Sequence, residues 1–90
     1  MEWDDLAARR LSTRELRIFL AVTHSGSMAK AAKTIGTAQP AISKAIADME
    51  VTLGVRLLDR GPQGVAPTQY GRALIKCGIA VFNELKQGID

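Results

Sequence analysis

The hydrophobic pattern predicts a first helix that starts after Ser12 and ends near Gly26. Apolar residues such as Leu16 and Phe19 recur on one helical face. Ser12 can accept a hydrogen bond from the main chain of Glu15 while the Glu15 side chain reaches back, which is a capping box. A glycine at the far end can adopt the left-handed conformation that closes a helix. This segment therefore carries both a start signal and a stop signal.

Two more helices are predicted next. Ser27 can cap a short helix over 28–35 that is rich in alanine, and small side chains allow another helix to approach closely. Thr37 is the expected cap of the following helix, over about 38–53, and Pro40 then falls in the first turn, where a missing N–H is tolerated. Apolar residues on this third helix recur every three or four positions and form a stripe that we expect to be buried: Ile42, Ile46, Met49 and Leu53.

A short hairpin and a long helix are predicted for the remainder of the chain. Residues 55–58 are typical of a strand, residues 61–64 of a turn, and residues 65–66 of a returning strand. Thr68 can cap a final helix over 69–88, which would be about 30 Å long.

The order of these elements predicts a mainly α fold, a winged helix-turn-helix followed by a long helix. In this motif a small residue, here Ala32, lets two helices cross closely, and a glycine, here Gly36, occupies the turn. An apolar residue on the second helix, here Ile42, fills the space between them, and the hairpin forms the wing. The predicted parts are an N-terminal arm over 1–10, the three helices and wing over 11–67, and a linker or dimerisation helix over 68–90.

Composition excludes several classes of protein and site. The chain has 90 residues with one cysteine and one histidine, so neither an intrachain disulfide nor a Cys/His metal cluster can form, and no cofactor is expected. The side chains that nucleophilic or acid–base catalysis needs are scarce, which argues against an enzyme. No apolar run approaches the roughly 18 residues that span a bilayer, and no signal peptide is recognisable, so we expect a cytoplasmic protein.

Positive charge is concentrated in the middle of the chain. The net charge is +3, but residues 27–76 alone hold seven basic side chains against three acidic ones, a local excess of +4. Such an excess is weak support for a nucleic-acid-binding face, and on charge alone an ordinary solvated surface explains it equally well.

The outward face of the helix over 38–53 carries residue types that can contact DNA. If the apolar stripe is buried, the residues facing outward are Gln39, Ser43, Lys44 and Ala47. Glutamine can pair with adenine through two hydrogen bonds, lysine can donate to guanine or to a phosphate, and serine can contact either. An exposed helix face that is merely polar is the alternative interpretation of this pattern.

The final helix predicts a second interface. Its two adjacent apolar stripes are more than one thin domain can cover, whereas two such helices side by side can bury both. We therefore expect an antiparallel dimer, and the alternative is that the helix packs only on its own domain. The residues expected at the dimer contact are Leu74, Ile75, Gly78, Val81, Phe82 and Leu85.

Two runs are specific in both their residues and their separation: 39–43 (QPAIS) and 53–57 (LGVRL). Together with 16–22, 26–32 and 67–71, they make the chain resemble the N-terminal DNA-binding domain of LysR-type transcriptional regulators. The resemblance extends over nearly the whole chain.

The resemblance implies a bacterial transcription factor that binds partly palindromic double-stranded DNA as a homodimer. It places the helix over 38–53 in the major groove and the wing over 59–65 on the DNA backbone or minor groove. The first turn of the second helix and backbone amides at helix starts are expected to contact phosphates. Carried over residue by residue, the implied DNA contacts are Ser27, Lys30, Thr37, Gln39, Pro40, Ala41, Ser43, Lys44, Arg60 and Gln63.

The sequence departs from the family pattern in several places, and two of these departures concern the expected DNA contacts. Lys44-Ala45 stands where members commonly carry Arg-Gln, and lysine cannot form the planar bidentate fork of arginine. Ala29 stands where threonine is common, which removes one expected phosphate contact. Both departures concern sequence preference and leave the expected fold unchanged.

Full-length members of this family carry a larger C-terminal ligand-sensing domain, which the chain lacks. The chain is therefore expected to be a piece of a longer protein, and a small-molecule inducer is expected to act only through the missing domain. The alternative function is a winged-helix module that binds protein instead of DNA, with acidic or bulky residues on the outer face of its third helix. The polar face described above argues against it, although Asp48 lies nearby.

Overall fold

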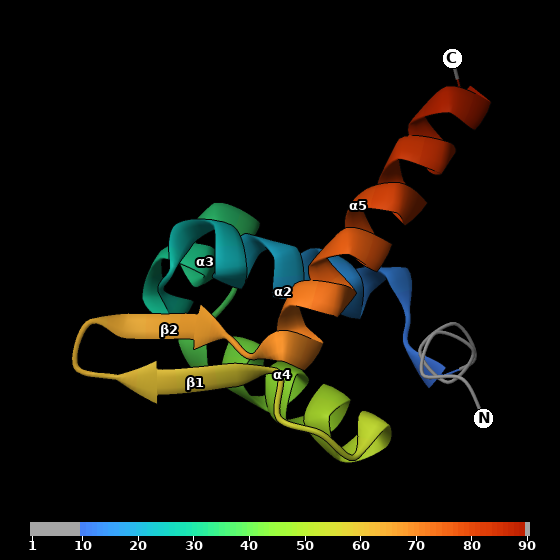
Figure 1. Ribbon diagram of the computed structural model, residues 1–90. Coiled ribbons are helices and arrows are strands. Elements are labelled where there is room, and N and C mark those ends of the chain that lie inside the picture. The colour runs from blue at the N-terminus through green and yellow to red at the C-terminus, as the bar shows by residue number, and fades with distance from the viewer. Residues whose placement is uncertain (1–9, 90) are drawn as a thin grey trace.

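The computed structural model describes residues 10–89, and its elements follow one another in the predicted order (Figure 1). Three helices form the body, an antiparallel hairpin extends from one side, and the last helix crosses the body and projects beyond it (Figure 1). This arrangement confirms the predicted winged helix-turn-helix with a long final helix. The predicted arm over 1–10 lies outside the described residues except for Arg10. The elements are α2 (Thr13–Ser25), α3 (Met28–Ile35), α4 (Gln39–Leu53), β1 (Leu58–Gly61), β2 (Gly64–Pro67) and α5 (Gln69–Ile89).

Side-chain caps begin α2 and α3 as predicted. The Glu15 N–H donates to Ser12 Oγ at 3.1 Å, and the Ser12 N–H donates to Glu15 Oε1 at 3.0 Å, which completes the capping box. At the start of α3 the Lys30 N–H donates to Ser27 Oγ at 3.2 Å. A cap of this kind typically contributes about 1 kcal/mol. Both caps join residues close in sequence, so they need no help from the rest of the fold.

The start of α4 differs from the prediction, because Thr37 does not cap it. α3 ends at a left-handed Gly36 (φ 83°), and the N–H groups of Gly36 and Thr37 both donate to the Ala32 carbonyl oxygen, at 2.9 and 3.0 Å. Thr37 is thereby committed to closing α3. Ala38 occupies the cap position of α4 without a side-chain hydrogen bond, and Pro40 lies in the first turn as predicted.

The hairpin begins later than predicted. β1 starts at Leu58, so residues 55–57 do not belong to the ladder. Instead, the N–H groups of Leu57 and Leu58 donate to Glu50 Oε2 on α4, at 2.7 and 3.3 Å. The Thr68 N–H donates to the Leu57 carbonyl oxygen at 3.0 Å. A side chain of α4 and the residue before α5 thus satisfy backbone groups that would otherwise need a strand partner.

A close backbone contact holds the hairpin against the turn between α2 and α3. The Val65 N–H donates to the Gly26 carbonyl oxygen at 3.1 Å. Gly64 makes this approach possible, because its φ is +118° and a Cβ there would overlap the Gly26 carbonyl oxygen. The wing is therefore held next to the first turn of α3.

The core lies where α2, α3, α4 and the beginning of α5 meet. The predicted stripe of α4 is buried along its whole length, from Ile42 to Leu53. Leu74 of α5 is completely buried in the same cluster. Full burial of one such side chain contributes about 1.5–3 kcal/mol, so Leu74 anchors the long helix to the domain.

Candidate nucleic-acid interface and the linker helix

The outer face of α4 is exposed and its side chains are mostly small. The exposed residues include Gln39, Pro40, Ala41, Lys44 and Ala47. Alanines on this face keep the helix narrow, which suits entry into a DNA major groove about 12 Å wide. Because Ala38 provides no side-chain cap, no protein side chain competes with an anion at the start of α4.

Ser43 is only half-exposed, so the prediction that it faces outward is confirmed in part. Its hydroxyl donates to Met28 Sδ on α3 at 3.5 Å. A thioether sulfur is a weak acceptor. Exchanging this contact for one with DNA would therefore cost little.

Lys44 forms an ion pair with Asp48, one turn further along α4. Lys44 Nζ lies 2.9 Å from Asp48 Oδ2, and the two side chains are 77% and 56% exposed. The hydrogen bond to Asp48 and the attraction of its negative charge raise the pKa of Lys44. No role was predicted for Asp48, although its i, i+4 spacing from a lysine on an exposed helix face is the signal for such a pair.

Further basic side chains lie on the elements beside α4. Lys30 and Lys33 on α3 are exposed, and α3 contains no acidic residue. In Figure 1, α3, the start of α4 and the hairpin lie on one side of the molecule, and the far end of α5 lies on another. The predicted contact Thr37 fits less well, because its N–H already donates to Ala32 and its side chain is half-buried. The prediction that the Thr37 amide is open to a phosphate is therefore wrong.

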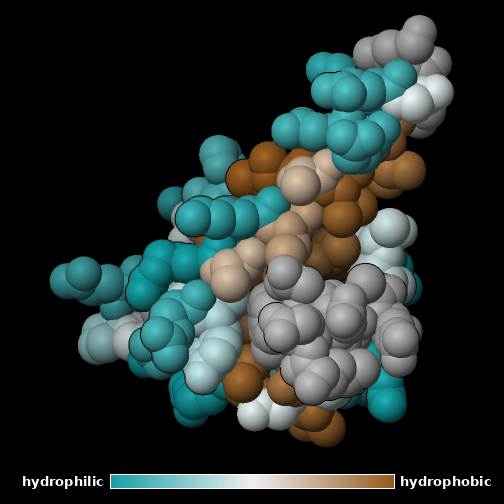
Figure 2. Space-filling view, turned by 45° about the vertical axis from the view of Figure 1, so that its right-hand side comes forward, coloured by the Kyte–Doolittle hydropathy of each residue, from teal (hydrophilic) through white to brown (hydrophobic). Residues whose placement is uncertain are grey.

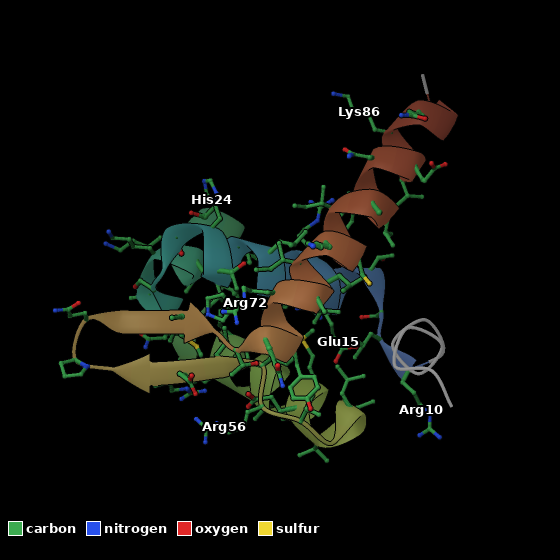
Figure 3. All side chains as sticks on the ribbon, viewed as in Figure 1. Arg10, Glu15, His24, Arg56, Arg72 and Lys86 are labelled. Carbon is green, nitrogen blue, oxygen red and sulfur yellow. The ribbon has the colours of Figure 1, made fainter. Side chains whose placement is uncertain are left out.

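The wing presents both of its predicted contacts, Arg60 and Gln63, to solvent. A second arginine, Arg56, lies just before β1 and points away from the body below the hairpin (Figure 3). Its Nε is 3.9 Å from Asp59 Oδ1, and both side chains are more than 70% exposed. An ion pair that is this exposed to solvent contributes little to stability. Arg56 is thus a further basic group near the wing, with no predicted role.

The apolar face of α5 has two halves that differ in what covers them. In the first half Leu74 is buried, and Gly78 packs against Leu20 of α2, whose side-chain atoms lie 3.1–3.3 Å from the position of a Cβ at Gly78. The same face continues through Val81 and Leu85, which are 36% and 48% exposed. Figure 2 shows this hydrophobic surface running along α5 beyond the body. The prediction that Leu74 and Gly78 contact a partner is wrong, because both face their own domain.

A groove opens between α2 and the second half of α5. Ile75 and Phe82 flank the apolar face and are half-buried, and the Arg17 guanidinium of α2 lies 5.7 Å from the centre of the Phe82 ring. Ile79, which had no predicted role, lies beyond them on the same flank and is 51% exposed. The groove is lined by Thr13, Arg14, Arg17, Leu20, Phe82, Leu85 and Lys86. Within residues 10–89, the second half of α5 is therefore only partly covered.

The remaining side chains with reactive or metal-binding potential are dispersed. Within residues 10–89 no three His, Cys, Asp or Glu side chains are placed to hold a metal ion together. No helix in this part of the chain is long and apolar enough to cross a membrane. His24 is exposed in the last turn of α2 (Figure 3). A basic side chain at this position interacts favourably with the negative end of the helix dipole.

The helix-turn-helix and the wing coincide with a known family model. Residues 13–72 match the model for bacterial regulatory helix-turn-helix proteins of the lysR family. The chain belongs to the LysR family. The relatives that it matches are transcriptional regulators, which agrees with the prediction that it is not an enzyme.

Curated relatives match over most of this chain but only part of their own. The HTH-type transcriptional regulator YdcI of Escherichia coli strain K12 is 34% identical over 85 residues, which are 94% of this chain and 28% of YdcI. The SDS degradation transcriptional activation protein of Pseudomonas sp. strain ATCC 19151 is 44% identical over 63 residues, 70% of this chain and 21% of that protein. The chain spans about a quarter of the length of these relatives.

Solved structures of LysR-family domains on DNA have the same fold. The BenM DNA-binding domain in complex with benA site 1 DNA is 34% identical, with a TM-score of 0.83 over 88% of this chain and 92% of that chain. The CbnR DNA-binding domain in its DNA complex is 32% identical, with a TM-score of 0.82 over 87% and 90%. Most of the chain therefore shares its fold with domains whose structures were solved on DNA.

Proposed function

We propose that this chain binds double-stranded DNA sequence-specifically, as the DNA-binding domain of a LysR-type transcriptional regulator. The observation that carries the proposal is the outer face of α4, which is exposed, narrow and uncapped at its start. Basic side chains on α3 and the wing flank it. The DNA complexes of the BenM and CbnR domains support the proposal, because the chain shares their fold.

The proposed contacts divide into base readout and phosphate positioning. α4 enters the major groove, where Gln39 and Lys44 reach base edges while Pro40, Ala41 and Ser43 allow close approach. The first turn of α3, with Ser27 and Lys30, and the wing residues Arg60 and Gln63 contact the backbone or minor groove. The side chain of Thr37 remains a candidate contact, but its amide does not.

The proposed dimer is formed by the second halves of two antiparallel α5 helices. Val81 and Leu85 would form the contact together with Ile75, Phe82 and Ile79 on one side of them, because these side chains keep apolar surface exposed in the protomer. A two-fold dimer places two α4 helices on half-sites about 34–36 Å apart, or a multiple of that distance. An inverted repeat is the DNA symmetry that matches this arrangement.

The test is fluorescence anisotropy on labelled duplexes across a salt series, with analytical ultracentrifugation of the same samples. One duplex carries an inverted repeat and the other a scrambled sequence. The proposal predicts tighter binding of the inverted repeat, a bound dimer, and affinity that falls steeply with salt. No binding of either duplex at low salt would contradict it and favour the protein-interaction alternative.

We further propose that the protein acts in the bacterial cytoplasm, where the chromosome is accessible. Its curated relatives are several times longer than the region they share with this chain. Any response to a small-molecule inducer is proposed to reside in parts of such relatives that have no counterpart here. Thermal stability of the chain should therefore be unaffected by small effector molecules, which differential scanning fluorimetry can check.

A further inference from the structure

The helix proposed to read DNA is not basic. α4 carries one basic side chain, Lys44, and two acidic ones, Asp48 and Glu50. Glu50 is turned toward the hairpin and accepts hydrogen bonds from backbone N–H groups there. The outer face is left with the Lys44–Asp48 pair, in which the two charges cancel. A carboxylate exposed on a surface that meets a polyanion requires an explanation.

We propose that Asp48 is a specificity-determining residue. Asp48 holds Lys44 in an ion pair on the outer face of α4 and thereby weakens binding to DNA in general. Lys44 then binds well only to sequences that offer hydrogen-bond partners to both side chains. The proposal rests on the role of α4 as the recognition helix. It adds to that role a residue that disfavours binding to non-matching DNA sequences.

The Lys44–Asp48 pair would interact differently with matching and non-matching DNA sequences. On an arbitrary sequence, Lys44 reaches a phosphate either by leaving Asp48 or by bridging the two anions. In both cases the Asp48 carboxylate lies close to phosphates and is repelled by them. On a matching sequence, Lys44 donates to guanine while Asp48 accepts from the exocyclic amino group of cytosine or adenine. Discrimination thus comes from a repulsive element as well as an attractive one.

The geometry makes this pair accessible to DNA and separable from the fold. Lys44 and Asp48 are both more than half exposed, and Ala47 leaves open space beside them. Exposed ion pairs contribute little to stability. Asp48→Asn should therefore leave the fold and the dimer unchanged, so that changes in binding report on recognition.

The experiment compares the chain with Asp48→Asn, Lys44→Gln and the double variant. The probes are a duplex selected from a random pool by the unaltered chain and a scrambled duplex of the same base composition. Gln87→Lys is the matched control, because it changes net charge equally at an exposed position of α5 away from Val81 and Leu85. Ultracentrifugation verifies that every variant has the same oligomeric state.

Asp48→Asn should bind the scrambled duplex about five- to tenfold more tightly per protomer near 0.1 M salt, because one newly neutralised phosphate steepens the salt slope by about 0.9. The selected duplex should gain less, so the ratio of the two affinities falls. In the Lys44→Gln background, Asp48→Asn should leave the salt slope unchanged. The control Gln87→Lys should behave like the unaltered chain.

Two results would overturn the proposal while leaving DNA binding intact. An unchanged ratio between selected and scrambled duplexes would remove the specificity role of Asp48. If Asp48→Asn increased the affinity equally with and without Lys44, the ion pair would not be the cause of the discrimination. If the unaltered chain selects no duplex at low salt, the proposed DNA-binding function itself fails, and this inference fails with it.

Discussion

α4 and α5 each bury one face, but their exposed faces differ in the size of their side chains. The start and middle of α4 expose mostly small or polar groups, such as Ala41 and Ala47. The second half of α5 exposes Ile79, Val81 and Leu85. Large exposed apolar groups mark a protein contact, whereas a narrow polar helix suits a nucleic-acid groove. Periodicity identifies the buried face, and the sizes of the remaining side chains indicate what the other face meets.

The largest expected effect comes from a charge on α5. Val81→Glu should abolish the dimer, and binding of an inverted repeat should weaken by about a hundredfold or more, because linked binding of two modules is lost. Ultracentrifugation and anisotropy measure both effects. The control is Gln87→Glu, on the opposite side of α5, which should leave the dimer intact. A Val81→Glu protein that still dimerises would contradict the proposed contact.

Charge reversal on α4 should have the next largest effect. Lys44→Glu should weaken binding on the order of a hundredfold, because it removes a donor to bases and adds a second carboxylate next to Asp48. Circular dichroism should show an unchanged fold, since Lys44 is exposed. Lys76→Glu on α5 makes the same charge change at a position away from both proposed interfaces. Equal losses for the two variants would show that only net charge matters.

The wing should contribute affinity without base preference. Arg60→Ala should weaken all duplexes about equally and lower the magnitude of the salt slope by about 0.9 per protomer, because one phosphate contact is lost. The measurement is a salt titration on several duplexes. A changed base preference with an unchanged slope would refute the assignment of Arg60 to the backbone.

The smallest expected effect separates the two halves of α5. Gly78→Ala should leave the dimer unchanged, because Gly78 faces Leu20 of its own domain. The free energy of unfolding should change by less than about 1 kcal/mol, since the gain in helix propensity is offset by crowding of the flexible leucine. Chemical denaturation measures this change. Dissociation of the dimer would mean that Gly78 lies at the partner contact after all.

The parts of the fold that sequence predicts well depend on local signals. The Ser12–Glu15 capping box, the Ser27 cap and the buried stripe of α4 each involve residues a few positions apart. The start of β1 could not be predicted from the sequence. Glu50 of α4 accepts hydrogen bonds from backbone N–H groups at and just before the start of the strand. Thr37 was misassigned because two adjoining helices compete for it, and closing α3 prevails.

The candidate interfaces were predictable to different extents. The sequence pattern identifies the outward face of α4, and the spacing of Lys44 and Asp48 already permits their ion pair. On α5 the same pattern predicts a single apolar face. It cannot show that α2 covers this face at Leu74 and Gly78 and leaves it open at Val81, because that depends on the angle between the helices.

The most direct test of the account is an NMR titration of the ¹⁵N-labelled chain with an inverted-repeat duplex. The account predicts that the largest amide shift changes occur at Gln39, Ala41 and Lys44 on α4 and at Arg60 on the wing. The amide signals of residues on the outer side of α5, such as Gln87, should not change their chemical shifts. Changes confined to α5, with α4 unaffected, would contradict the claim that α4 is the surface that reads DNA.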